Sequence, residues 1–144
     1  MKRIFVPVLF LLLAAAAHGE TGVLGTWKNP TGSTIQVYLC GPNVCAKVIA
    51  ISSKAPSHID SENPSPALRK RPICGLQIGR NFRLTAPDHA EGGRLYDPES
   101  GNTYSGSMTS EGDLLKLRGY IGIALFGRTE TWTRAQSGIA PCQA

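Results

Sequence analysis

The sequence lacks several features that mark common enzymes and nucleic-acid-binding proteins. It contains no Cys-x-x-Cys pair and no Gly-x-Ser-x-Gly motif, and its three histidines do not fall at zinc-ligand spacing beside the cysteines. These absences argue against a zinc site and against an α/β-hydrolase nucleophile. The basic residues are scattered, so no positive stripe could follow a phosphate backbone. We therefore predict no metal, no cofactor and no nucleic-acid partner.

Long apolar segments are also missing beyond residue 17. The chain opens with Lys2 and Arg3, continues through a mostly apolar run of 14 residues, and reaches Ala17-His18-Gly19. This order is typical of a secretory signal peptide, and the run is shorter than the roughly 20 residues needed to span a bilayer. We predict a signal peptide over residues 1–19 with cleavage near Gly19. The mature protein would then be periplasmic or secreted, not membrane-spanning.

Removal of Lys2 and Arg3 lowers the formal net charge from +5 to +3 and leaves residues 20–144, which is the length of one domain. No stretch of this mature chain shows a sustained helical period, and polar or glycine-rich turns recur about every 8–12 residues. Both observations favour an all-β fold. We predict strands over residues 24–29, 34–40, 73–79, 81–85, 93–96, 103–109, 114–120 and 128–134, with a further strand after the turn at 41–44.

Alternation of apolar residues defines two hairpins. In the first, a four-residue turn at 41–44 places Leu39 opposite Ala46, Val37 opposite Val48 and Ile35 opposite Ala50. In the second, a turn at 110–113 places Met108 opposite Leu115, Gly106 opposite Leu117 and Tyr104 opposite Gly119. Each register gathers apolar side chains on one face. A closed sheet of about eight such strands has room inside for one small ligand.

All four cysteines lie in the predicted mature chain, and an oxidising compartment favours their pairing, although four cysteines allow three connectivities. The first hairpin register puts Cys40 directly across from Cys45, within disulfide reach. This arrangement leaves Cys74 to pair with Cys142.

A long loop over residues 52–72 carries four prolines and the one basic cluster, Arg69-Lys70-Arg71. The arginines could satisfy loop carbonyls, or their guanidinium groups could recognise an anionic head group. Ser53, His58 and Asp60 also share this loop, but nearness in sequence does not make a catalytic triad. Asp88, His89 and Glu91 are too few to indicate a metal site. No catalytic residues are predicted.

Gly25-Thr26-Trp27 at the first mature strand and Trp132-Thr133-Arg134 at the last resemble the ends of calycin barrels, the lipocalins and fatty-acid-binding proteins. This resemblance implies that Trp27 fills the base of the barrel and that Arg134 stacks across its ring. A guanidinium over an aromatic face contributes roughly 0.5–2 kcal/mol.

A longer set of motifs resembles the bacterial envelope family called domain of unknown function 2147. The motifs are Cys40-Gly41 with Cys45, Asp60-x-x-Asn63-Pro64, Leu68-Arg69-x-Arg71-Pro72, Gly75-Leu76, Tyr96-Asp97-Pro98, Leu115-Lys116-x-Arg118-Gly119-Tyr120 and Leu125-Phe126-Gly127-Arg128-Thr129. The likeness spans residues 25–134 and implies a lipocalin-like barrel in the envelope, with no established reaction. Cys74 and Cys142 depart from the pattern, as does the lack of an aromatic residue over 86–91.

The leading hypothesis is a non-enzymatic binder of a small apolar or amphipathic ligand. The predicted lining is Ile35, Val37, Leu39, Val48, Tyr104, Met108, Leu115 and Leu117, with Arg69 and Arg71 meeting a polar head group. The alternative is a protein–protein interaction module, such as an inhibitor or an envelope-assembly factor, with a solidly packed barrel and a working long loop. An accessible interior of a few hundred Å³ would favour the binder.

Overall fold

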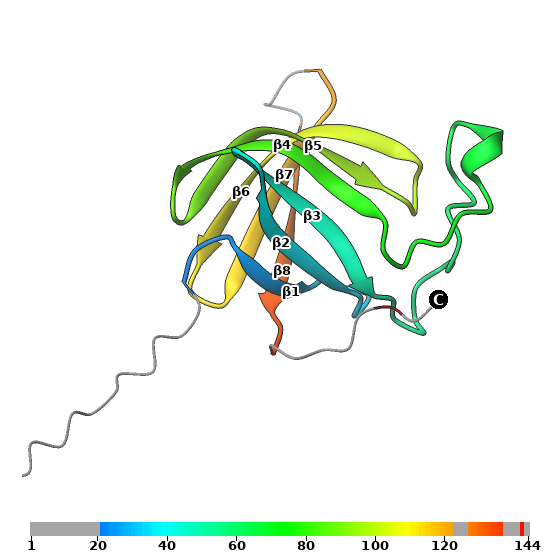
Figure 1. The fold of residues 1–144 in the computed structure, drawn as a ribbon, viewed down its shortest axis with the longest axis horizontal. Coiled ribbons are helices and arrows are strands. Elements are labelled where there is room, and N and C mark those ends of the chain that lie inside the picture. Colours follow the sequence, from blue (N-terminus) through cyan, green and yellow to red (C-terminus); the bar gives the residue numbers. More distant parts are fainter. Residues whose placement is uncertain (1–20, 123–126, 137–141, 143–144) are drawn as a thin grey trace, which may run out of the picture.

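The structure is a computed structural model that describes residues 21–122, 127–136 and Cys142. The predicted signal peptide lies outside these residues. Eight antiparallel strands form a closed barrel in which each strand pairs with the next and the last returns to the first (Figure 1). The all-β barrel prediction is therefore confirmed. The strands are β1 (Gly25–Lys28), β2 (Thr34–Cys40), β3 (Asn43–Ala50), β4 (Gln77–Ala86), β5 (His89–Asp97), β6 (Asn102–Glu111), β7 (Leu114–Tyr120) and β8 (Arg128–Arg134).

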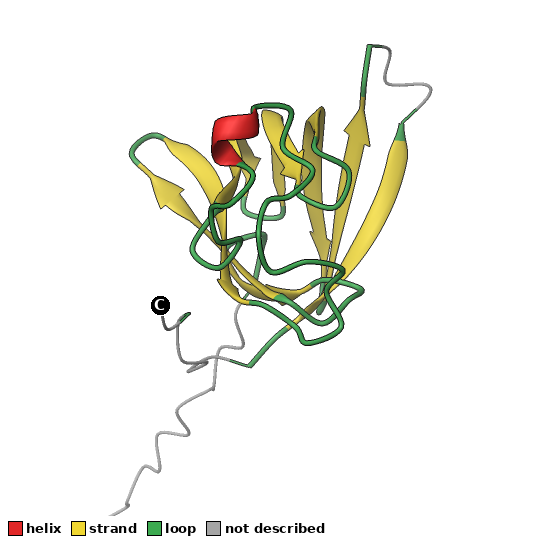
Figure 2. Cartoon of the chain, turned by 90° about the vertical axis from the view of Figure 1, so that its right-hand side faces the viewer, coloured by secondary structure: helices red, strands yellow, loops and turns green. Residues whose placement is uncertain are grey.

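Up-and-down topology divides the connections between two ends of the barrel. The β1–β2, β3–β4 and β5–β6 connections lie at one end, which we call the mouth; the β2–β3, β4–β5 and β6–β7 turns lie at the other, which we call the base. The β3–β4 connection is long and contains the short 3₁₀ helix η1 (Pro66–Leu68), drawn red in Figure 2. It projects beyond the strands at the mouth end (right in Figure 1) and is bonded to β5 through Asp60 and Tyr96. No helix among the described residues has the length and apolar content needed to cross a bilayer.

The base is closed by packed aromatic side chains. Trp27 is fully buried and donates its indole N–H to the Val23 carbonyl at 2.9 Å, while the Arg134 guanidinium lies 4.1 Å from the Trp27 ring centroid. Phe82 is also fully buried, and its ring lies against Gly93, where an added Cβ would stand 2.3 Å from ring carbons. Glycine at position 93 is therefore needed to admit the ring.

Both hairpin registers differ from the prediction by two residues. In the first, Val37 pairs with Ala46 and Ile35 with Val48, because Asn43 and Val44 belong to β3 and the chain reverses at Gly41 and Pro42. Gly41 has a φ of 65°, which permits such a tight turn. A shift of two residues keeps each side chain on its predicted face.

The second hairpin shows the same error for the same reason. Glu111 pairs with Leu114, so the turn consists of Gly112 and Asp113, and Met108 faces Leu117 rather than Leu115. Gly112 has a φ of 60°.

The predicted strands at 73–79 and 81–85 are in fact one strand, β4, which begins at Gln77. Asn81, with a φ of 61°, lies where the register of β4 against β3 shifts, and the break in the alternation pattern there reflects a bulge.

Both predicted disulfides are present, with Cα–Cα separations of 5.8 Å for Cys40–Cys45 and 5.6 Å for Cys74–Cys142. The predicted register placed Cys40 directly opposite Cys45, but the two residues are not opposed in the structure. Cys45 pairs with Tyr38 and Cys40 with Asn43, so the bridge runs diagonally across the hairpin. The second ties Cys142 to the end of the long connection, beside β3.

Candidate functional site

A cavity of about 600 Å³ occupies the mouth half of the barrel. Its deep wall is apolar and comes from seven strands, β2 to β8, and the long connection. The residues of this wall are Ile35, Val48, Ile73, Ile78, Leu95, Tyr104, Leu117 and Trp132. Most of them are shielded from solvent, and Ile35, Val48 and Leu117 have side chains no more than 4% exposed. The volume lies within the range of roughly 300–1,000 Å³ that is typical of small-molecule sites.

The rim of the cavity carries charge. Glu62 comes from the long connection, Asp97 and Glu99 from the end of β5 and its turn, and Glu130 from β8. Arg128 is the single cationic side chain among the described lining residues. Partial burial, followed by the negative charges of Asp97 and Glu130, raises the pKa of the Glu99 carboxyl above its usual range. The carboxylates on the two sides of the rim are thus close enough to repel one another.

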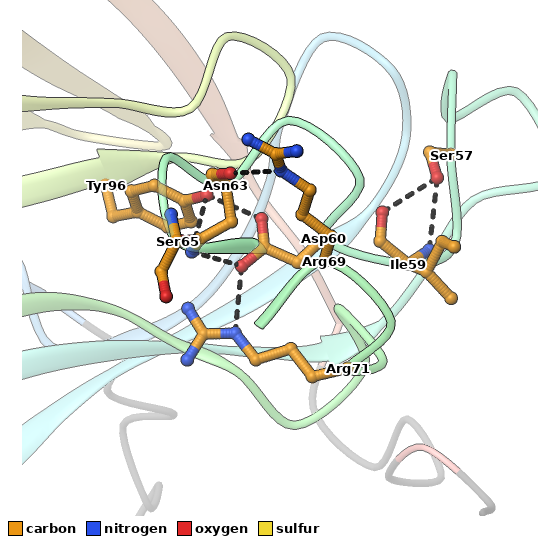
Figure 3. Close-up of polar contacts among 8 residues, drawn as sticks. All are labelled: Ser57, Ile59, Asp60, Asn63, Ser65, Arg69, Arg71 and Tyr96. Carbon is orange, nitrogen blue, oxygen red and sulfur yellow. Dashed lines mark hydrogen bonds and ion pairs between the residues drawn. The ribbon is translucent and has the colours of Figure 1, made fainter. Parts of the chain in front are cut away.

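The long connection is held in place by Asp60, whose side chain is fully buried and whose polar contacts are drawn in Figure 3. It accepts hydrogen bonds from the Tyr96 hydroxyl at 2.5 Å, the Asn63 amide at 2.8 Å and the Arg71 Nε at 2.8 Å. Because Tyr96 belongs to β5, the carboxylate joins the connection to the barrel wall. Both carboxylate oxygens of Asp60 accept hydrogen bonds, as a buried charge requires.

This hydrogen-bond network shifts the pKa of both Asp60 and Tyr96. Burial alone would raise the pKa of Asp60, but the hydrogen bonds from Tyr96, Asn63 and Arg71, together with the Arg71 charge, outweigh it and hold the pKa below its usual value. Burial, the hydrogen bond to Asp60 and the Asp60 charge raise the pKa of Tyr96 to about 12. At neutral pH the carboxylate is charged and the phenol is a donor.

The two arginines expected to meet a polar head group lie in the long connection. Arg71 forms the ion pair with Asp60, and Arg69 donates from Nε to the Asn63 carbonyl at 2.8 Å. Neither borders the cavity. In the structure these arginines therefore bond to groups of their own loop. Nothing in the sequence pattern predicted the acidic rim.

The predicted lining residues fall into three groups. Ile35, Val48, Tyr104 and Leu117 border the cavity. Val37, Met108 and Leu115 are buried in the packed base and do not border it. Leu39 is not buried in the core as expected: it is 56% exposed, because the pairing of β1 with β2 ends at Val37 and Leu39 lies beyond it.

Sequence reasoning missed five apolar cavity residues: Ile51 and Ile73 of the long connection, Ile78 of β4, Leu95 of β5 and Trp132 of β8. Their apolar character was visible, but no strand alternation predicted which way they face.

The side-chain sets weighed for chemistry do not come together as sites. No hydrogen bond joins the side chains of Ser53, His58 and Asp60 in the described chain. His89 contacts Thr109 at 2.8 Å and Glu91 at 3.2 Å, and over residues 21–122 and 127–136 no grouping of three or more metal-ligating side chains is found.

Comparison with solved structures finds the same fold in a distant protein. Protein HP1028 from Helicobacter pylori, described as belonging to the lipocalin family, matches with a TM-score of 0.71 and 22% sequence identity. The match covers 81% of this chain and 86% of the other. None of the curated proteins compared matches significantly. A family model for an uncharacterised protein conserved in bacteria matches residues 25–134. The chain therefore belongs to the DUF2147 family and has a lipocalin-like barrel.

Proposed function

We propose that this protein is an exported, non-enzymatic binder that holds a small hydrophobic or amphipathic molecule inside its barrel. The observation that carries the proposal is the cavity of about 600 Å³ with an apolar wall. Apolar surface facing a cavity of this size remains hydrated until a ligand covers it, so burial of an apolar ligand is favourable. Ile35, Val48, Tyr104 and Leu117 would contact the ligand.

The hollow mouth favours a binder over an interaction module, for which we expected a solidly packed barrel. Export is proposed on the signal-peptide pattern of residues 1–19 and is supported by the two disulfides, which persist in oxidising compartments. Mass measurement of the protein recovered from a periplasmic fraction tests this part. We expect a chain that begins at Glu20, and recovery of the uncleaved chain in the cytoplasm would contradict it.

Ligand binding is tested with protein purified from the periplasm without detergent. We expect native mass spectrometry to show a bound small molecule, or the emptied protein to enhance the fluorescence of the neutral apolar probe N-phenyl-1-naphthylamine. Val48→Phe places a ring in the cavity and should abolish both signals. Leu39→Phe adds the same ring at the exposed hairpin tip and serves as the matched control. An empty protein that does not take up the probe would overturn the proposal.

A further inference from the structure

The cavity changes its chemistry from depth to rim. The wall at depth is apolar, whereas the described rim residues carry four carboxylates and one guanidinium, a formal charge of −3. The chain without its first 19 residues has the opposite sign, +3. Negative charge is therefore concentrated at the rim, where a ligand would enter, although the net charge of the mature chain is positive.

The rim carboxylates differ in how many hydrogen bonds they accept from the protein. Asp97 accepts hydrogen bonds from the backbone N–H of Glu99 at 3.0 Å and from the Ser100 hydroxyl at 2.7 Å, which hold the β5–β6 turn. The Glu99 carboxylate makes no hydrogen bond or ion pair with any described residue. Its pKa is raised by partial burial and, after that, by the negative charges of Asp97 and Glu130. A positive group at the rim would relieve this repulsion.

Glu130 is oriented by a tryptophan that also borders the cavity. The Trp132 indole N–H donates to Glu130 Oε1 at 2.7 Å, and Trp132 is 6% exposed. The carboxylate and the aromatic ring thus lie side by side on the inward face of β8. Carboxylates attract ammonium groups by charge, and aromatic faces attract them through the ring quadrupole.

We propose that the ligand of this cavity is an amphipathic cation, whose alkyl or aromatic body fills the apolar depth and whose amine or quaternary ammonium group lies against Glu99 and Glu130. The inference rests on the proposed function of the cavity as a binding site. It reverses the sign of head group expected from Arg69 and Arg71, which the structure places outside the cavity.

The test is competition against N-phenyl-1-naphthylamine by three ligands that share a dodecyl chain, each below its micelle concentration or, for the alcohol, its solubility limit. They are dodecyltrimethylammonium, dodecanol and dodecanoate. At pH 7 and low salt we expect the ammonium compound to displace the probe at a concentration about tenfold lower than dodecanoate. High salt should shrink this preference, because the Debye length falls from about 10 Å at 0.1 M to about 3 Å at 1 M.

Glu99→Gln/Glu130→Gln keeps the shape of the rim and the acceptor for Trp132 but removes two charges, and should abolish the preference while leaving dodecanol competition unchanged. Glu91→Gln/Glu111→Gln removes two carboxylates toward the base and is the matched control. Probe uptake with dodecanoate competing as well as or better than the ammonium compound would overturn the cationic ligand and leave the binding function intact. Failure of the probe and of all three dodecyl ligands would instead overturn the binding function itself.

Discussion

The two halves of the barrel are made from the same strands but are filled differently. The base is filled by fully buried side chains that belong to one hydrophobic cluster and do not border the cavity, among them Trp27, Phe82, Met108 and Leu115. At the mouth, inward residues of the same strands, such as Ile35 and Leu117, face a cavity of about 600 Å³. β3 shows the change along one strand, because Val44 lies in the packed base and Val48 borders the cavity.

This difference separates the source of stability from the proposed site of function. Close packing at the base provides the dispersion contacts and apolar burial that hold a small domain together. The mouth gives up part of that packing, and its long connection is fastened by other means: the Cys74–Cys142 bridge and the buried Asp60 network. A covalent bond and a polar network can hold a wall in place without filling the space beside it.

The largest expected contrast is between the two disulfides. The Cys74–Cys142 bridge at the mouth spans 68 residues, and the Cys40–Cys45 bridge near the base spans five. Because loop closure restricts the unfolded chain more when the loop is longer, replacing the mouth pair with serine should lower the free energy of unfolding by about 4 kcal/mol, against about 2 kcal/mol for the hairpin pair. Urea denaturation of both double variants measures this difference, and equal losses would contradict the dependence on loop length.

A second contrast uses one substitution at two positions of β3. Val44→Phe adds a ring to the packed base and should lower the free energy of unfolding by about 1–3 kcal/mol. Val48→Phe adds the same ring toward the cavity and should change stability by less than about 1 kcal/mol while blocking the probe. Thermal and urea unfolding provide the comparison. Equal destabilisation at the two positions would show that the mouth is packed in solution.

The smallest effect concerns the pH range over which the Asp60 network holds the long connection. The pKa of Asp60 is lowered, so its contribution is present above the unfolded value of about 4 and is lost as the pH falls through the folded pKa. The pKa of Tyr96 is raised to about 12, so its contribution is complete below the unfolded value of about 10 and is lost as the pH rises through about 12.

Tyr96→Phe removes the hydrogen bond to Asp60 and should lower the free energy of unfolding at pH 7 by about 1–2 kcal/mol. It should also remove the alkaline loss between about pH 10 and 12. The absorbance of tyrosinate in the wild-type protein should show one group that ionises near pH 12. Tyr104→Phe, which changes a phenol outside the network, is the control, and a wild-type profile without a late-ionising tyrosine would contradict the geometry at Asp60.

Much of the fold followed from the sequence because alternation in a half-buried strand reports directly which side chains share a face. The eight-stranded barrel, the Cys40–Cys45 pair and the apolar faces of both hairpins were predicted. The turns were not, because Gly41 and Gly112 allow a two-residue reversal that residue type alone did not distinguish from a four-residue one. The resulting error of two residues preserved the faces and changed only the cross-strand partners.

The site was harder to predict because its position depends on depth along the barrel, which alternation does not encode. Val37 and Ile35 share a face, yet only Ile35 borders the cavity. The charged rim is assembled from Glu62, Glu99 and Glu130, which come from three separate segments and meet only in the closed barrel. The basic cluster at residues 69–71 was conspicuous in sequence, but Arg69 and Arg71 each donate from Nε to a group of their own loop.

Closure of the base joins the beginning of the barrel sequence to its end, because Arg134 in the last strand donates to the Gly22 carbonyl, 112 residues earlier in the chain. Contacts between such distant positions are slow to form, so the ring of strands cannot be completed until almost the entire polypeptide is free to search for its partners. A chain that emerges gradually from an export channel would therefore stay loosely structured while it crosses. It would acquire its final shape only after its last strand had been released on the far side.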